Sequence, residues 1–255
     1  MMHLLKRILA YSAVLFLAVS CSTVYQYGPG NLGTESRMMI TPVNRETPQT
    51  SHYLSGRYSF NNGRGYNENE SCRYGEAFYN LGHSRKYLST ALGAGVFGGS
   101  YEVEKYAIAA GWKNFYGISG MAQAALNLPL GPVNWRIIGL RGGFALENGP
   151  LFDFREKNRN VPGFNEFTSG RTTGYFAPYS ELCIHARDFR FGLSGNNTFL
   201  LGKENMLDFI ASYSFFLEYQ DLSLVYQLTG SVKQGQNHSI GLVIKLPCRA
   251  NQPGE

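Results

Sequence analysis

FYGISGMAQAALNLPLGPVNWRIIGLRGGFAL, residues 115–146, alternates apolar side chains with small or polar ones on both sides of a turn that contains proline and glycine. In the first arm Ile118 and Leu126 fall on one face, and Ser119 falls on the other. A period of two that persists over this length predicts strand rather than helix, because successive side chains of a strand point to opposite faces. We therefore interpret the stretch as two long strands joined at residues 129–132.

From residue 52 onward the chain contains further runs of this kind. The strand-like runs are residues 52–60, 72–82, 87–102, 107–128, 134–147, 173–186, 188–195, 206–218, 221–231 and 238–246. Short connections at 82–86, 130–132, 186–188 and 219–221 alternate with longer polar ones at 61–71, 148–172, 196–205 and 232–237, and the 103–114 stretch fits neither class. Short turns that alternate with long loops are typical of outer-membrane barrels. The pattern predicts an all-β fold, an antiparallel up-and-down β-barrel of about eight to ten strands.

The two faces of these runs differ in chemistry. The polar face consists mostly of Gly, Ala, Ser and Asn, which suit the crowded interior of a narrow barrel. We expect this face to line the lumen and its few charges to pair there, because an unpaired buried charge is costly. The predicted polar network of the lumen comprises Arg57, Glu76, Arg141, Glu181, His185, Arg190, Glu218 and Lys245.

The opposite face is apolar along most runs and is expected to face lipid. Its members include Leu92, Val96, Ile138 and Leu140. Aromatic residues near the ends of the runs resemble the girdles found at membrane interfaces. These aromatic residues are Tyr53, Tyr101, Trp135, Tyr213, Tyr219 and Tyr226.

The N-terminal residues have the pattern of a secretion leader. Lys6 and Arg7 precede an apolar run at residues 8–18 that is too short to span a bilayer as a stable helix. Residues 17–21, Leu-Ala-Val-Ser-Cys, resemble a bacterial lipobox, in which the cysteine is lipidated and becomes the mature N-terminus. The predicted segments are a signal peptide at 1–20, a lipidated N-terminus and linker at 21–51, a barrel at 52–247 and a polar tail at 248–255.

With its lipobox-like leader, short linker and Gly- and Tyr-rich strands, the chain resembles small bacterial outer-membrane β-barrel proteins with a lipoprotein signal. The resemblance implies that Cys21 carries acyl chains such as palmitate and anchors the protein to outer-membrane lipids, with both termini periplasmic. It also implies a non-enzymatic structural or interaction role. The last run ends at Leu246 without a terminal aromatic residue, which departs from the usual pattern of these proteins.

Two alternatives of other classes stay open at this stage. A soluble periplasmic barrel of the lipocalin type, tethered by Cys21, would place the apolar face inside around an apolar ligand. A lipid-modifying enzyme would need His and Ser side chains within hydrogen-bond reach. The candidate dipeptides are His83-Ser84 and His238-Ser239, but neighbours on a strand point to opposite faces.

Other motifs do not predict a cofactor, metal or nucleic-acid site. Residues 93–98, Gly-Ala-Gly-Val-Phe-Gly, have the residue spacing of a dinucleotide-binding fingerprint. They lie inside a strand pattern, whereas the fingerprint requires a helix directly after the glycines. Cys72, Cys183 and Cys248 have no zinc-site spacing and no confident disulfide pairing. The net charge of +5 comes from scattered basic residues, so nucleic-acid binding is not expected. The charged 148–172 loop is expected to be solvated, with contact to a protein partner as the alternative.

Overall fold

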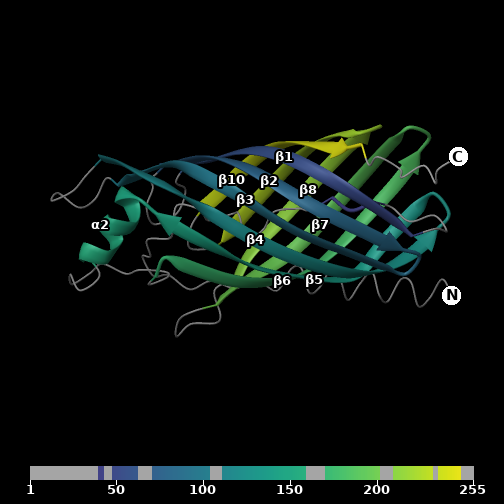
Figure 1. Cartoon of the computed structure of the whole chain (residues 1–255), viewed down its shortest axis with the longest axis horizontal. Helices are drawn as coiled ribbons and strands as arrows, with labels where there is room; N and C mark the ends of the chain where they lie inside the picture. The colour runs from purple at the N-terminus through teal and green to yellow at the C-terminus, as the bar shows by residue number, and fades with distance from the viewer. Residues whose placement is uncertain are drawn as a thin grey trace, which may run out of the picture.

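The protein is a closed barrel of ten antiparallel strands in a computed structural model that describes residues 40–42, 48–62, 71–103, 111–158, 170–201, 209–231 and 235–247. The elements are β1 (Gln49–Asn62), β2 (Ser71–Arg85), β3 (Leu88–Val103), β4 (Gly111–Leu130), β5 (Val133–Asn148), α2 (Pro150–Asn158), β6 (Thr172–Ala186), β7 (Phe189–Leu201), β8 (Phe209–Tyr219), β9 (Leu222–Ser231) and β10 (Gly235–Leu246). Each strand pairs with its neighbours in sequence, and β1 pairs with β10 to close the sheet (Figure 1). This confirms the predicted fold class.

The two ends of the barrel have different connections. At one end, here called the short-turn end, two-residue turns join β2–β3, β4–β5, β6–β7 and β8–β9, and β1 begins and β10 finishes there. Gly131, Arg187 and Gln220 have φ values of 65°, 55° and 54°, as tight hairpin turns require. The opposite end, here called the long-loop end, carries α2 (Figure 1).

Several of the predicted boundaries need correction, and the largest is that β7 continues through Leu201, whereas a strand at 188–195 and a loop at 196–205 were predicted. β2 continues through Arg85, so its turn lies at Lys86 and Tyr87 rather than at 82–86. The stretch that could not be placed, 103–114, is an ordinary connection at the long-loop end, because β3 ends at Val103 and β4 begins at Gly111. Longer connections also follow β1, β5 and β7, whereas only residues 232–234 separate β9 from β10, where a longer loop at 232–237 was predicted.

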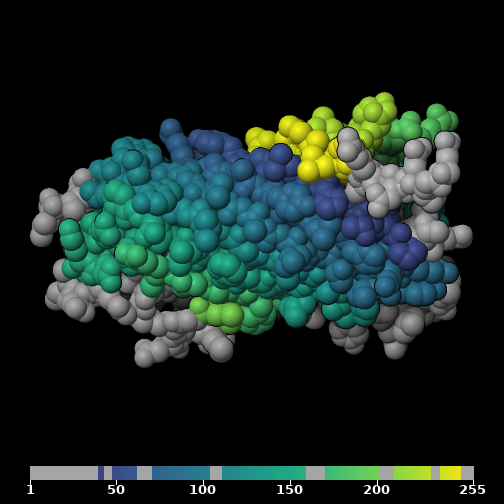
Figure 2. Space-filling view, in the orientation of Figure 1, coloured from purple at the N-terminus to yellow at the C-terminus, as the bar shows by residue number. Residues whose placement is uncertain are grey.

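The exterior of the barrel is apolar, and the interior combines polar and small side chains with three clusters of buried aromatic and aliphatic ones. Outward side chains such as Leu92 and Ile138 are 64% and 65% exposed. Inward side chains such as Ser119 and Ser194 are buried. On the side shown in Figure 2 the side chains of the strands form a continuous wall along the barrel. This orientation is the opposite of the one that an apolar-lumen barrel of the lipocalin type requires.

The predicted aromatic girdle is partly wrong. Tyr213, Tyr219 and Tyr226 point outward and are exposed, as expected of residues at an interface. Tyr53 is only 3% exposed and packs in a cluster inside the short-turn end, and Tyr101 packs against an interior cluster at the long-loop end. Both residues share the inward parity of their strands, so the period of two decides their direction, whatever their distance from a strand end.

Glycine makes room for aromatic rings inside the barrel. A Cβ atom on Gly139 would lie 2.3 Å from the Tyr179 ring, and one on Gly192 would lie 1.9 Å from the Phe216 ring. Rings from neighbouring strands therefore lie flat over these glycines and fill the lumen. These two contacts show how glycine on one strand accommodates a ring from the next strand inside the ten-stranded barrel.

The helix α2 closes part of the long-loop end. Leu151 packs with Phe97 and Phe115 in an interior cluster, and Phe152 and Phe154 are also buried. The predicted solvated loop at 148–172 is therefore wrong for its first part, because residues 150–158 form this packed helix. Within the part of the chain that the structure describes, no helix combines the length and hydropathy needed to cross a bilayer.

Candidate functional site: the lumen and its short-turn mouth

The middle of the lumen is crossed by a polar network from three strands. Arg57 of β1 pairs with Glu76 of β2, with 2.8 Å between Arg57 Nη2 and Glu76 Oε2. Arg57 also donates from Nη1 to Gln227 Oε1 of β9 at 2.9 Å, although these residues are 170 positions apart in the sequence. Closure of the sheet between β1 and β10 brings them together.

Arg141 lies in the same part of the lumen with different contacts. Its Nε donates to Gln123 Oε1 at 3.2 Å, and its guanidinium lies 4.8 Å from the centre of the Tyr179 ring. The cation therefore rests on an aromatic face, an arrangement that is favourable in a site shielded from water. Sequence reasoning placed Arg141 in the lumen but did not identify the amide and the ring.

Glu181 pairs with an arginine that sequence reasoning missed. Arg136 of β5 is buried and contacts Glu181 through a buried ion pair. A bulge between Arg136 and Gly139 sets two residues against Ser180, so Arg136 and Arg141 both point inward despite their odd separation. Two adjacent apolar residues, Ile137 and Ile138, break the alternation and were the available signal.

Ser180 stabilises this bulge from the outer side of the wall. Its hydroxyl donates to the main-chain oxygen of Arg136 at 3.1 Å and accepts from the indole Nε1–H of Trp135 at 3.1 Å. The bulge interrupts the ladder of strand hydrogen bonds, and these two bonds replace part of it. Ser180 thus helps to aim Arg136 at Glu181.

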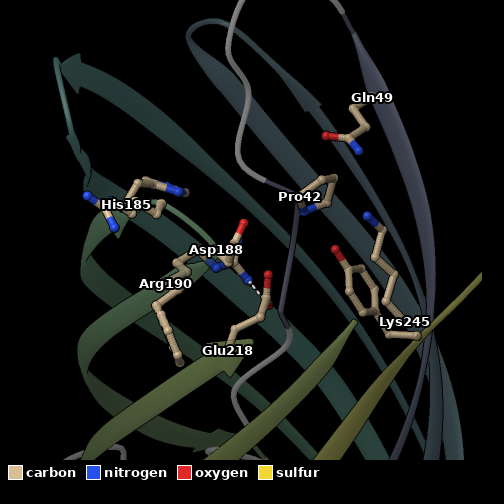
Figure 3. A pocket seen from close by; sticks show the side chains of 10 residues that line it. Pro42, Gln49, His185, Asp188, Arg190, Glu218 and Lys245 are labelled. Carbon is tan, nitrogen blue, oxygen red and sulfur yellow. Dashed lines mark hydrogen bonds and ion pairs between the residues drawn. The ribbon is translucent and has the colours of Figure 1, made fainter. Parts of the chain in front are cut away.

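The second ion pair of the short-turn end joins β7 and β8. Arg190 Nη2 lies 2.6 Å from Glu218 Oε2, and Glu218 also accepts a hydrogen bond from the Ser223 hydroxyl at 3.0 Å. Both members of the pair were predicted lumen residues. The dashed line in Figure 3 marks the pair at one wall of the mouth.

His185 and Lys245 complete the predicted set and lie at the rim. Lys245 Nζ is 3.9 Å from Asp221 Oδ1, an exposed pair of little energetic weight. His185 and Lys245 line a pocket of about 190 Å³, together with Pro42, Gln49, Tyr53, Arg187, Asp188, Phe189, Arg190 and Glu218 (Figure 3).

A segment from before β1 enters this mouth. The side chains of Ile40 and Thr41 are buried. The main-chain oxygen of Thr41 accepts hydrogen bonds from Arg136 Nη2 at 3.3 Å and from Arg190 Nη1 at 3.0 Å. The sequence predicted a linker here, because the short apolar run Met38-Met39-Ile40 is too brief to indicate a strand or helix.

A further buried ion pair lies at the long-loop end. Arg155 of α2 donates from Nη2 to Glu147 Oε1 of β5 at 2.7 Å, and both side chains are buried. The guanidinium groups of Arg155 and Arg171 also lie over the Phe152 ring, at 5.8 Å and 4.9 Å from its centre. Sequence analysis did not assign Glu147 and Arg155 to the network, because the helical fold of 150–158 was not expected.

The candidate catalytic dipeptides separate onto the two faces of the wall. His83 bonds to the Thr50 hydroxyl at 2.8 Å, whereas Ser84 is buried. His238 bonds to the Tyr226 hydroxyl at 2.8 Å, while Ser239 bonds to Ser59 inside the barrel. In neither dipeptide do these contacts join the histidine to its neighbouring serine.

The remaining motifs have structural roles in the described residues. The fingerprint-like residues 93–98 lie within β3. Cys72 and Cys183 are buried, form no disulfide with each other and belong to clusters at opposite ends of the lumen. Across the described ranges no group of three His, Cys, Asp or Glu side chains is arranged to hold a metal ion. Cys21, the leader and Cys248 lie outside the described residues.

Comparisons with known proteins give barrels of the outer membrane. No family model and no curated protein matches the chain. An outer-membrane channel from Pseudomonas putida F1 matches with 11% identity over 82% of this chain and 100% of its own, with a TM-score of 0.43. The transport unit of the autotransporter AIDA-I from Escherichia coli has 11% identity over 88% and 100%, with a TM-score of 0.45. The translocator domain of NalP from Neisseria meningitidis has 9% identity over 80% and 90%, with a TM-score of 0.42.

Proposed function

We propose that the chain is a lipid-anchored β-barrel of the bacterial outer membrane with a structural or interaction role and no catalytic step. The observation that carries the proposal is the apolar exterior around a polar, ion-paired lumen. Leu92, Ile138 and Leu140 are each more than half exposed in the isolated chain, whereas Arg136, Arg141 and Glu181 are buried. In water this apolar exterior would stay exposed at a cost in free energy, whereas in a bilayer the hydrocarbon would cover it.

The proposed anchor and the order of segments along the chain set the orientation of the barrel in the membrane. On this proposal Cys21 is acylated and sits in the periplasmic leaflet. β1 starts at the short-turn end, so that end faces the periplasm and the long-loop end faces outward. The linker between the anchor and β1 then lies on one side of the membrane.

The interaction surface on this proposal is the long-loop end. Leu151 and Phe154 of α2 are buried, whereas Asp153, Glu156 and Lys157 are exposed. The helix thus offers a charged outer face on a packed support. A protein partner that approaches the 148–172 segment would meet these three side chains first.

Membrane fractionation tests the proposal. Wild-type protein and Cys21→Ala are expressed with the leader, and membranes are washed with alkaline carbonate. We expect both proteins to stay in the washed outer membrane, because the strands themselves are embedded, and only the wild type to carry acyl chains. A folded Cys21→Ala protein in the soluble fraction would contradict the proposal.

A matched pair of exterior substitutions separates lipid from water as the surroundings. Leu140→Arg lies near the middle of β5, and Leu222→Arg lies at the start of β9 at the short-turn end. In a bilayer we expect a loss of about 2–4 kcal/mol for Leu140→Arg and about 0–1 kcal/mol for Leu222→Arg, measured by urea unfolding in vesicles. Equal small effects would show that the exterior does not face hydrocarbon.

A further inference from the structure

The main chain of the Ile40–Pro42 segment is held by side chains from three different strands. Asn80 of β2 donates from Nδ2 to the Ile40 oxygen at 3.1 Å. Arg136 of β5 and Arg190 of β7 both donate to the Thr41 oxygen. These donors come from well-separated strands of the wall and converge on two successive carbonyl groups. Recognition of a backbone rather than of side chains suits any extended peptide.

The side chain of Ile40 is buried in an apolar cluster of the lumen. Ile40 is 2% exposed and packs in a cluster with Tyr53, Cys183, Phe216, Val225 and Val243. Full burial of an isoleucine side chain removes its apolar surface from water and so favours the bound state. The mouth therefore selects a branched aliphatic residue next to the bonded carbonyl.

The two arginines that bond to the segment are each paired with a glutamate of the barrel wall, which balances their charge and orients them. Glu181 pairs with Arg136, and Glu218 pairs with Arg190, so each guanidinium is oriented before it meets Thr41. Preorganised donors lose little freedom when a ligand binds, which favours affinity. The pairs also remove the charge cost of a site that holds neutral carbonyl oxygens.

The site extends beside Pro42 into a pocket. Pro42 borders the pocket of about 190 Å³, whose walls include Gln49, His185 and Lys245. Figure 3 shows Pro42 between the Arg190–Glu218 wall and Lys245. The volume lets a peptide extend beyond the three residues seen in the mouth.

We propose that the short-turn mouth of the lumen is a binding site for an extended peptide, occupied in cis by Ile40–Pro42. The partner it fits is a protein segment with a branched aliphatic residue followed by a small residue and proline, presented from the side on which β1 begins. The tethered segment has a high effective concentration and competes with a partner segment for the site. A partner segment binds when the tethered one is displaced.

Peptide binding to purified full-length protein in detergent tests this proposal, and the result does not depend on where the barrel resides in the cell. The probe is a fluorescent capped peptide with the sequence of residues 38–43, Met-Met-Ile-Thr-Pro-Val. The receptor is a variant with Ile40→Gly, Thr41→Gly and Pro42→Gly, which weakens the tethered occupant. We expect micromolar binding to this variant and at least tenfold weaker binding to the wild type, because its own segment fills the site.

Matched changes show whether the contacts of the site carry the binding. Asn80→Ala in the triple variant removes the donor to the Ile40 oxygen and should weaken binding about fivefold to tenfold. Asn196→Ala removes another buried inward asparagine, on β7 away from the mouth, and should leave binding unchanged. Equal binding of a scrambled peptide, equal binding to wild type and variant, or no binding at all would overturn the proposal.

A second design is used if the triple variant does not fold. A protease site is inserted at residues 43–47 in a Cys21→Ala background, and the chain is cut after folding. We expect the N-terminal fragment to co-elute with the barrel and to be displaced by excess peptide. A fragment that separates at once, or one that the peptide does not displace, would show that no peptide site exists.

Discussion

The two ends of the barrel are closed in different ways. At the short-turn end three residues from before β1 are held through their main chain, by Arg136, Arg190 and Asn80. At the long-loop end a helix is held through its side chains, by Leu151 and by the Arg155–Glu147 pair. The first closure uses donors that belong to the barrel wall and are fixed by pairs within it. At the long-loop end the cation, Arg155, belongs to the closing helix itself.

This difference shows which buried charges can regain contact with water without disruption of the barrel. Arg136 and Glu181 both stand on strands, so neither can leave the lumen unless the barrel opens. Arg155 stands on α2, which can move away from Glu147 without breaking a strand pair. The same substitution should therefore cost more at the short-turn end than at the long-loop end.

Arg136→Met is expected to have the largest effect. It leaves Glu181 buried without its guanidinium partner, a change that usually costs about 3–5 kcal/mol. We expect a loss of that size in the free energy of unfolding, measured by urea titration in vesicles with tryptophan fluorescence. The double variant with Glu181→Leu should recover much of the loss. Wild-type stability of the single variant would break the comparison.

Arg155→Met is expected to have a smaller and local effect. When α2 moves away, Glu147 regains water, so the loss is limited to the free energy that docks the helix, about 1–3 kcal/mol. Hydrogen exchange should show lost protection at residues 150–158 and unchanged protection in the strands. A fall in the global unfolding midpoint as large as that of Arg136→Met would show that the two ends are equivalent.

Ser180→Ala is expected to have the smallest effect. It removes the hydroxyl that bonds the Trp135 indole and the Arg136 oxygen at the bulge, and we expect a total loss of about 0.5–1.5 kcal/mol in the free energy of unfolding, measured by urea titration in vesicles. Ser100→Ala, which breaks one outward bond to Asn114 on an unbulged pair, is the control. Equal losses for the two variants would mean that the bulge does not position Arg136.

Much of the fold was predictable because the alternation of side chains is local. Within β4, for example, Ile118 and Ser119 fall on opposite faces by parity alone, and in the closed barrel the first is exposed and the second is buried. The same reasoning put Arg57, Glu76, Arg190 and Glu218 on the inner face. It did not supply the Arg136–Glu181 pair, because a single inserted residue at a bulge reverses parity.

The sequence by itself determined the period of two, the positions of most hairpin turns and the apolar chemistry of the outer face, since these depend on neighbours along the chain. Only the tertiary structure decided what meets across the lumen. Arg57 reaches Gln227, and Thr41 reaches Arg136 and Arg190, through a sheet that closes on itself. Contacts between residues so far apart in sequence depend on strand number and register, which accumulate over the whole barrel and are not encoded in any one segment.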